Sequence, residues 1–459
     1  MVRYAGKLRY GSRGDRLGCL SDTRLRLIVS SSTTNVRIIC SCLVLLHAVI
    51  VRADWPAFRG PQGDGHAPVS ESRGGIPVRW SETENIAWKT PIPHRGWSTP
   101  VVAEGKVWLT TATKDGRQSF VICLDADSGR ILLNRRLFET ENPEPLGNDM
   151  NGYASPSPVA ESGRVYVHFG SYGTACLDTM TYEVLWQRRD LPCRHYRGPG
   201  SSPILYQDYL VLTMDGVDVQ YLIALDKETG RTVWKTERTT DWDDLGPDGK
   251  PFMEGDMRKA YTTPLVVKTD DGPQMISVGA KAAYGYDPAN GRELWKVRYA
   301  GYSNAASPVF GDGLVYVITG FGRTELLAVR IDGTGDVTDT HIAWQSRRLV
   351  PRTPSPLLVD GLLFTLSDTG SLICRDAAMG EDIWTERLRG NFAASLLYAD
   401  GRMYCFSREG RATVLSAGPK AEILATNTLE SGFMASPAVS DGALFLRSKK
   451  HLYRIESAK

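Results

Sequence analysis

The sequence predicts an all-β fold, an eight-bladed β-propeller built from four-stranded blades. Three observations predict it: a turn motif that ends in a large residue recurs along the chain, a Ser/Thr-Pro dipeptide marks each unit, and Gly (45 residues) and Pro (25 residues) are abundant. Gly supplies positive φ angles and Pro presets turn geometry, as a chain with many tight turns requires. Regular internal repetition is typical of propellers and other repeat architectures.

The turn motif places an Asp eight residues before a large apolar residue. Its clearest copies are Asp226 to Trp234, with Gly230 at the turn, and Asp287 to Trp295. The Asp can bond backbone NH groups of the turn, the Gly takes the left-handed position, and the Trp can pack between neighbouring sheets. The residues to which we assign this structural role are Asp125, Asp178, Trp186, Asp226, Trp234, Asp287, Trp295, Asp376 and Trp384, with Trp344 and Trp88 in divergent copies.

Two copies depart from the pattern. The Asp125 copy ends in Leu133 where a Trp is expected, and the Asp178 copy has Glu183 in place of the turn Gly. A weaker copy ends near Leu424. We expect the Trp residues at the motif's end, Trp186, Trp234, Trp295 and Trp384 among them, to be buried at equivalent positions between blades.

The second mark is a small hydroxyl residue followed by Pro. It occurs as Thr99-Pro100, Ser157-Pro158, Ser202-Pro203, Thr263-Pro264, Ser307-Pro308, Ser355-Pro356 and Ser436-Pro437, with Ser395-Leu396 as a degenerate eighth copy. A β-branched or apolar pair, a polar turn and an alternating strand follow it, so each unit reads as four short strands of one blade.

The last unit begins at Ser436 and has room for three strands before Lys459. The segment Asn85–Pro91 resembles a Trp-bearing fourth strand and precedes the first Ser/Thr-Pro mark. We therefore expect the N-terminal strand to complete the last blade, which removes the open sheet edge that a ring would otherwise leave. The propeller is assigned to residues 85–459, and residues 54–84 to an N-terminal extension.

Residues 1–53 are predicted to be a leader. They hold nine of the 54 Lys and Arg residues and two of the 52 Asp and Glu residues, so the rest of the chain has 45 basic and 50 acidic residues. Residues 38–51 form an apolar run in which Ser41 and His47 are the clearly polar members. This is the layout of a signal peptide or a signal anchor. We expect export to the periplasm or cell surface, membrane contact only through an uncleaved leader, and no attraction to nucleic acid.

Five Cys residues follow the leader: Cys123, Cys176, Cys193, Cys374 and Cys405. An odd number cannot pair fully within one chain, and no CxxC or CxxCH occurs, which disfavours zinc ribbons and covalently attached haem. The sequence predicts no metal site. Cys123, Cys176 and Cys374 each stand two residues before a repeat Asp, and we interpret them as small apolar residues on an inner strand.

In this strand order, the link from each outer strand to the next inner strand lies at one face, near the axis. Convergent loops on a rigid scaffold are a usual place for a binding site. The candidate ligand-binding residues in these links are His195, Tyr196, Arg197, Arg258, Tyr261, Tyr302, Asn304 and Arg352. Their recurrence favours an anionic or planar ligand. The alternative is that each Arg pairs with a local acid, such as Asp190 or Asp256. No residue is assigned a catalytic role, and His195 is interpreted as a hydrogen-bonding loop residue.

The run Ala-x-Asp-x-x-Thr-Gly-x-x-x-Trp that ends at Trp234 is similar to the tryptophan-docking repeat of quinoprotein alcohol dehydrogenases. It is equally similar to that of BamB-like propellers, which hold no quinone, and the resemblance covers about residues 85–459. The opening Asp54-Trp-Pro-Ala-Phe-Arg-Gly-Pro61 resembles the start of exported PQQ-repeat proteins of planctomycete-type bacteria. The resemblance implies the fold and leaves the activity open, because one propeller hosts many functions.

Three functions follow as hypotheses. The first is an exported, non-catalytic propeller that binds a protein partner or a small ligand at the funnel face and holds no cofactor. The second is a quinoprotein-type dehydrogenase that uses PQQ and Ca²⁺, for which Arg197, Arg258 and Arg352 would supply charge and Asp256, Asn151 and Asn304 would supply oxygen ligands. The adjacent Cys pair common over the quinone in such enzymes is absent. The third is a cell-wall polysaccharide-binding module.

Overall fold

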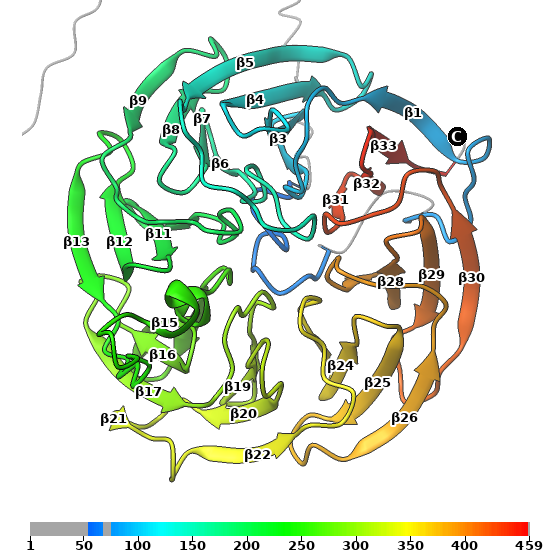
Figure 1. Cartoon of the computed structure of the whole chain (residues 1–459). Coiled ribbons are helices and arrows are strands. Elements are labelled where there is room, and N and C mark those ends of the chain that lie inside the picture. Colours follow the sequence, from blue (N-terminus) through cyan, green and yellow to red (C-terminus); the bar gives the residue numbers. More distant parts are fainter. Residues whose placement is uncertain (1–53, 68–74, 458–459) are drawn as a thin grey trace, which may run out of the picture. The chain divides into compact units, whose positions relative to one another are not determined.

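Eight β-sheets radiate from a common axis in the computed structural model of the chain, which describes residues 54–67 and 75–457 (Figure 1). Seven sheets have four strands and one has five. The predicted eight-bladed propeller is therefore confirmed. The predicted leader lies outside the described residues. In the described part of the chain, no helix is long and apolar enough to cross a membrane.

The first four blades follow the chain from inner to outer strand (Figure 1). Blade 1 contains β2 (Val101–Ala103), β3 (Lys106–Ala112), β4 (Gln118–Asp125) and β5 (Ile131–Glu139). Blade 2 contains β6 (Val159–Glu161), β7 (Arg164–His168), β8 (Thr174–Asp178) and β9 (Val184–Arg188). Blade 3 contains β10 (Ile204–Tyr206), β11 (Tyr209–Asp215), β12 (Gln220–Asp226) and β13 (Thr232–Glu237). Blade 4 contains β14 (Leu265–Thr269), β15 (Gly272–Val278), β16 (Ala282–Tyr286) and β17 (Glu293–Arg298).

The last four blades repeat this order. Blade 5 contains β18 (Val309–Gly311), β19 (Leu314–Ile318), β20 (Leu326–Arg330) and β22 (Ile342–Ser346). Blade 6 contains β23 (Leu357–Val359), β24 (Leu362–Leu366), β25 (Ser371–Asp376) and β26 (Asp382–Arg387). Blade 7 contains β27 (Leu397–Ala399), β28 (Arg402–Phe406), β29 (Arg411–Ser416) and β30 (Ile423–Thr428). Blade 8 contains β31 (Ala438–Ser440), β32 (Ala443–Arg447), β33 (His451–Ile455) and β1 (Ile86–Pro91).

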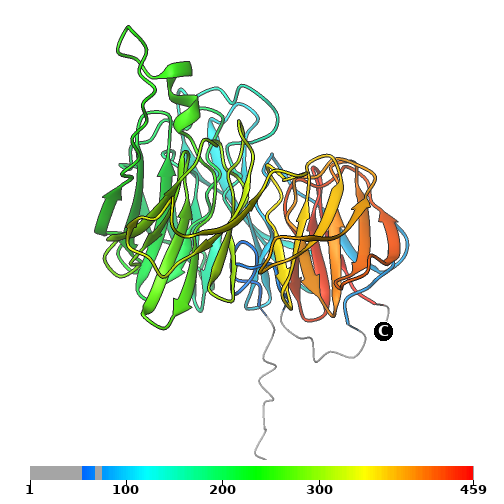
Figure 2. The same ribbon diagram turned by 90° about the horizontal axis from the view of Figure 1, so that it is seen from below.

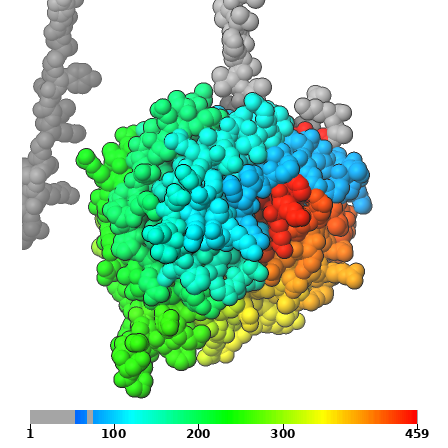
Figure 3. Space-filling view, turned by 45° about the horizontal axis from the view of Figure 1, so that its top comes forward, coloured from blue at the N-terminus to red at the C-terminus, as the bar shows by residue number. Residues whose placement is uncertain are grey.

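Blade 8 closes the ring with the N-terminal strand, as predicted. Strand β1 pairs antiparallel with β33, with Trp88 opposite Arg454 and Thr90 opposite Leu452. Figure 3 shows the C-terminal residues, in red, held between the blue N-terminal segment and the orange blade 7. Because strands from both ends of the sequence share one sheet, opening the ring requires breaking a strand pair and not only a blade-to-blade contact.

The residue opposite each motif Trp is small. Ala224 faces Trp234, Gly285 faces Trp295 and Cys374 faces Trp384 across the third and fourth strands. A Cβ built on Gly285 would lie 2.2 Å from Nε1 of Trp295, so a larger residue would displace the indole. The Cys residues at this site thus lie on the third strand of their blades, and not on an inner strand as the sequence suggested.

The Trp rings dock on the turn of the next blade. A Cβ added to Gly230 would lie 2.7 Å from the Trp186 ring, and one added to Gly291 would lie 2.5 Å from Trp234. Trp186 Nε1 also donates a hydrogen bond to the carbonyl oxygen of Lys227, at 2.9 Å. The turn Gly is therefore required by the approach of the neighbouring indole as well as by its positive φ of 71° at Gly230.

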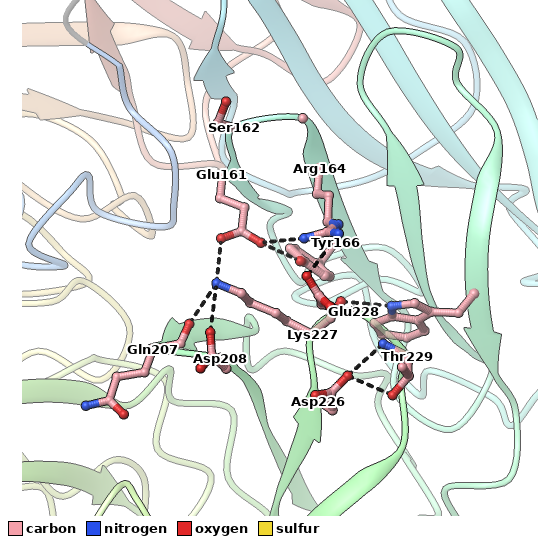
Figure 4. Close-up of polar contacts among 12 residues, drawn as sticks. Glu161, Ser162, Arg164, Tyr166, Gln207, Asp208, Asp226, Lys227, Glu228 and Thr229 are labelled. Carbon is pink, nitrogen blue, oxygen red and sulfur yellow. Dashed lines mark hydrogen bonds and ion pairs between the residues drawn. The ribbon is translucent and has the colours of Figure 1, made fainter. Parts of the chain in front are cut away.

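Figure 4 shows this turn and the ion pairs around it at the junction of blades 2 and 3. Asp226 Oδ1 accepts hydrogen bonds from the backbone NH of Thr229, at 2.8 Å, and from its hydroxyl, at 2.7 Å. Lys227 Nζ lies 3.0 Å from Glu161 Oε2 of blade 2, and Arg164 lies 3.3 Å from Glu228. The motif Asp holds the turn as predicted, and the residues that follow it bind the neighbouring blade.

Two predictions about the repeat were wrong in detail. Tyr182, and not Glu183, occupies the left-handed turn position of the Asp178 copy, with φ of 63°. The Tyr182 ring lies 6.0 Å from that of Trp108, in the same hydrophobic cluster as Leu133, so it fills space that a Trp at position 133 would have occupied. In addition, only Trp186 and Trp295 of the four Trp residues expected to be buried are so, while Trp234 and Trp384 are half-buried.

Trp295 is fully buried because blade 5 covers the outer edge of blade 4. A short strand in the long β20–β22 connection, β21 (Gly335–Asp336), pairs parallel with β17 and places Gly335 opposite Trp295. Trp295 Nε1 donates to the side-chain oxygen of Gln274 in its own blade, at 2.8 Å, in place of the inter-blade bond. A non-local insertion thus changes the environment of a residue that the repeat made equivalent to the others.

The inner strands surround a central channel. Residues 54–67 cross the end of this channel that is farther from the Ser/Thr-Pro marks. Trp55 bridges Val102 of blade 1, the backbone NH of Ala160 in blade 2 donates to Pro56, and Gly65 accepts from the NH of Tyr398 in blade 7. The segment appears in blue at the centre of the ring in Figure 1. It forms a plug that the sequence did not predict, because residues 54–84 carry no copy of the repeat.

Candidate functional site

A ring of hydroxyl groups surrounds the channel. The backbone NH of the Ser or Thr in each of the first seven marks donates to the hydroxyl of the next mark, and we call this ring of eight residues the hydroxyl collar. The seven bonds join Thr99 to Ser157 (2.9 Å), Ser157 to Ser202 (2.9 Å), Ser202 to Thr263 (3.0 Å), Thr263 to Ser307 (3.3 Å), Ser307 to Ser355 (3.0 Å), Ser355 to Ser395 (3.2 Å) and Ser395 to Ser436 (3.0 Å). The marks therefore join adjacent blades by hydrogen bonds near the axis. The recurrence of the Ser/Thr-Pro dipeptide is the sequence feature that corresponds to these bonds.

A cavity of about 570 Å³ lies above the collar. Six collar residues line it, and so does Phe58 of the plug. The residues two positions before the eight marks also line it: Trp97, Ser155, Gly200, Tyr261, Ala305, Thr353, Ala393 and Met434. Alternate residues of an extended segment point the same way, so the marks and these residues form two stacked rings. The upper ring is large at Trp97, Tyr261 and Met434 and small at Ala305 and Ala393.

The cavity opens toward the face that carries the blade-to-blade links. The longest link joins β13 to β14, contains the 3₁₀ segment η1 (Phe252–Arg258), and projects beyond this face (green in Figure 2). A Cβ on Gly255 would lie 2.1 Å from the carbonyl oxygen of Val217, so this close approach fixes the base of η1 on blade 3. Met253 and Asp256 of η1 reach the cavity, together with Met150 from the blade 1–2 link.

The arginines at this mouth are paired with acids. Arg197 Nε lies 3.0 Å from both carboxylate oxygens of Asp256, and Asp256 is buried. Arg258 pairs with Asp244, and its guanidinium lies over the ring of Trp242. The Arg197 pair corresponds to the local pairing considered as an alternative from the sequence. Neither arginine is a free cation, and their pairing leaves the mouth with no net charge from these groups.

The structure places three of the eight candidate ligand-binding residues on the cavity wall: Arg197, Tyr261 and Tyr302. His195 and Asn304 are buried behind the wall, and Asn304 donates from its side chain to the carbonyl oxygen of Ile318. Tyr196, Arg258 and Arg352 stand on the same links without lining the cavity. The candidate set did not include Trp97, Phe58 or the collar, which supply much of the wall.

Behind Tyr261 lies a buried cluster formed by Lys259, His195 and Cys193. Lys259 Nζ lies 3.5 Å from Nδ1 of His195, and Cys193 Sγ lies 3.7 Å from the same nitrogen. Burial, with the charge of Lys259, holds the pKa of His195 well below its usual range, so the imidazole is neutral. Burial likewise lowers the pKa of Lys259 to about 8. The cluster therefore holds one buried cation at neutral pH.

We expect Lys259→Met to stabilise the protein at pH 7. The difference between a folded-state pKa of about 8 and the ordinary 10.5 corresponds to about 3 kcal/mol of penalty for the buried charge. The folded-state pKa of this base is depressed, so the penalty is full below pH 8 and disappears as pH rises toward 10.5. Urea unfolding at pH 7 and pH 10 should show the variant's advantage shrinking; an advantage that does not vary with pH would contradict the assignment.

The residues of the cavity do not fit a Ca²⁺-bound quinone. Ca²⁺ prefers six to eight oxygen ligands, including carboxylates. Asp256 is the one carboxylate on the cavity wall, and Arg197 occupies both of its oxygens. In the described part of the chain, no three His, Cys, Asp or Glu side chains gather as a metal site. Of the oxygen ligands considered from the sequence, Asn304 is behind the wall and the Asn151 amide oxygen accepts from Ser155.

Solved structures with this fold include dehydrogenases and an assembly factor. The quinohemoprotein alcohol dehydrogenase from Comamonas testosteroni aligns with a TM-score of 0.62 and 12% identity over 89% of this chain and 81% of its own. BamB from Moraxella catarrhalis aligns with a TM-score of 0.54 and 12% identity over 81% of this chain and 99% of its own. A europium-containing methanol dehydrogenase gives 0.60 and 11% over 88% and 90%. At these identities the likeness shows the fold alone.

Sequence comparison identifies the family. A search of curated protein sequences gave no match. The PQQ-repeat family model described as outer membrane protein assembly factor BamB matches residues 80–237, 218–355 and 335–419, which together span most of the propeller. These matched ranges carry the Trp-docking turns and seven of the eight marks of the hydroxyl collar described above, and on this match the chain belongs to the PQQ-repeat β-propeller family of BamB.

Proposed function

We propose that this protein is a non-catalytic, exported binding propeller that takes a small ligand in its central cavity. The observation that carries the proposal is the shape and lining of that cavity. It is closed at one end by the plug, its volume of about 570 Å³ falls in the usual range of ligand sites, and aromatic and hydroxyl side chains line it. The leader pattern of residues 1–53 supports export.

The proposed function is non-catalytic because of the state of the titratable groups in and around the cavity. Catalysis by an acid or base needs a group that can reach a reacting atom and exchange a proton. On the cavity wall, Arg197 and Asp256 satisfy each other, while His195 and Lys259 are buried behind Tyr261. This arrangement supports binding over turnover.

A cavity-filling substitution tests the proposal. Ala305→Phe places a ring in the small side of the upper ring, and Ala343→Phe on the exposed face of β22 is the matched control. A panel of carboxylates, amides, sugars, amino acids and PQQ with Ca²⁺ is screened by thermal shift. We expect at least one compound to raise the melting temperature of the wild type and of Ala343→Phe, and to leave Ala305→Phe unchanged.

Three results would contradict the proposal. If no compound stabilises the wild type, or if Ala305→Phe responds like the control, the cavity is not a ligand site. If PQQ and Ca²⁺ give a quinone absorbance with substrate-dependent dye reduction, the protein is a quinoprotein dehydrogenase. Binding confined to oligosaccharides would favour the polysaccharide-binding function.

A protein partner is the second candidate, and one observation favours it. The projecting link between β13 and β14 exposes Leu245, Phe252 and Met253, with exposed fractions of 66%, 60% and 55%. Exposed apolar side chains gathered on one loop are typical of interaction sites. The BamB family model is named for an assembly factor, which agrees with a partner at this loop.

A further inference from the structure

The collar supplies hydrogen-bond donors to the floor of the cavity. Four of its residues on the cavity wall, Ser157, Ser202, Thr263 and Ser436, accept a backbone NH from the preceding blade. A hydroxyl that accepts one bond still has a proton to donate. Within residues 54–67 and 75–457, none of these four protons has an acceptor. The floor therefore offers four hydrogen-bond donors to a ligand that carries acceptors.

Three buried cations lie near the cavity, Arg59 and Arg447 beside the collar and Lys259 beside the upper ring. Arg59, Lys259 and Arg447 are at most 3% exposed, and none forms an ion pair with an acid in the described part of the chain. Burial lowers the pKa of Arg59 to about 10 and that of Arg447 to about 9, which leaves both charged at neutral pH. The charge of Asp64 partly offsets the lowering of the Arg59 pKa, but the Asp64 carboxylate does not form an ion pair with Arg59.

Each cation lies directly behind the cavity wall. Arg59 follows the wall residue Phe58 and donates to the carbonyl oxygen of Pro356, at 2.7 Å. Arg447 donates to the carbonyl oxygen of Ser98, at 3.2 Å, between Trp97 and Thr99. Lys259 Nζ lies 4.6 Å from the centre of the Tyr261 ring. Charges in a low-dielectric interior act over longer distances than in water, so these cations favour negative charge in the cavity.

The mouth has the opposite character. Its charged pairs, Arg197 with Asp256 and Arg258 with Asp244, are neutral as units, and Met150, Met253 and Phe321 add apolar side chains to its wall. A second negative group placed near Asp256 would be repelled by this carboxylate, whose paired cation, Arg197, is already neutralised. The cavity is thus suited to a single anionic group at the floor and an apolar body above it.

On this basis, and resting on the binding function proposed above, we propose that the cavity binds a monocarboxylate with an apolar body, the carboxylate on the hydroxyl collar and the body against Trp97, Tyr261 and Met434. Neutral hydroxyl donors suit a monoanion better than a dianion such as phosphate, since the cost of burying charge rises steeply with charge. The carboxylate can come from a free acid or from the C-terminus of a peptide.

The test uses the full propeller and matched ligands that differ in one group. Phenylacetate, phenylacetamide and 4-carboxyphenylacetate are titrated by calorimetry and by ligand-observed NMR at pH 7. N-acetyl-phenylalanine, with a free or an amidated C-terminus, tests the peptide source. We expect the monocarboxylates to bind at least about tenfold tighter than both the amides and the diacid, a preference of about 1.4 kcal/mol.

Substitution of a cation checks the origin of the preference. Lys259→Met should reduce the preference for carboxylate over amide about fivefold and leave amide affinity unchanged, because it removes charge behind the wall and no wall atom. Lys281→Met is the control, since Lys281 is a Lys on the same face that lies over Tyr302 and bonds the carbonyl oxygen of Ala300. Its carboxylate preference should match the wild type.

Three outcomes separate the inference from the proposed function. If amides or the diacid bind as tightly as the monoacids, or if only ligands of another class bind, the inference is overturned and the cavity remains a ligand site. If Lys259→Met keeps the full preference, the buried cations are not its source and the inference falls. If no ligand of any class binds, the proposed function fails as well.

Discussion

Asp215→Ala should lower the free energy of unfolding by about 3–5 kcal/mol, because it leaves the charge of Arg238 buried without a partner. Arg238 Nε lies 2.7 Å from Asp215 Oδ1 and Nη2 lies 2.8 Å from Oδ2, and the two side chains are at most 1% exposed. Nη2 also donates to Ser277 Oγ of blade 4, at 2.9 Å. Burial alone would lower the pKa of Arg238, but the Asp215 carboxylate, together with Tyr286 and Tyr284, outweighs burial and raises the pKa.

The double variant Asp215→Ala/Arg238→Met is the control for this result. It removes both charges, so most of the lost stability should return, since replacing a buried ion pair by apolar groups is often neutral or stabilising. Urea unfolding at pH 7 measures both variants. A single variant that loses under about 1 kcal/mol, or a double variant no better than the single, would show that the unpaired charge of Arg238 is not the source of the loss.

Trp295→Ala should cost about 3–5 kcal/mol, the usual range for deleting a buried aromatic side chain, and Trp234→Ala should cost about half as much. Trp295 is fully buried under β21, whereas Trp234 is half-buried and its indole NH has no partner in the described chain. The two residues occupy equivalent positions of the repeat, so each serves as the other's control. Equal losses in urea unfolding would mean that the β21 cover adds nothing to the packing of Trp295.

The sequence by itself determined the blade count, the closure by β1 and the turn chemistry. These features rest on local patterns: Asp226 and Thr229 bond within one turn, Gly230 takes a positive φ, and apolar residues alternate along each strand. Each copy of the repeat predicts the same local structure, so a divergent copy can be recognised by comparison with the regular ones. Even the closing strand carries its own Trp88.

The sequence predicted the location of the candidate site better than it predicted the residues that line it. The links do converge on one cavity, and Arg197, Tyr261 and Tyr302 line it. Sequence reasoning could not decide whether Arg197 is free or paired, because Asp256 is 59 residues away and lies on a link of irregular structure. Sequence reasoning also used the Ser/Thr-Pro marks only to delimit the repeat units, although these residues form the floor of the cavity.

Only the tertiary structure decided the plug, the cover over Trp295 and the buried cations. Arg59 bonds Pro356 across 297 residues of sequence, and Gly335 meets Trp295 through an insertion that, among the described residues, occurs in one blade. Such contacts occur once and join distant segments, so they leave no periodic signal in the sequence. The repeat fixed how each blade folds, whereas the charge and shape of the cavity come from side chains that meet only when the ring closes.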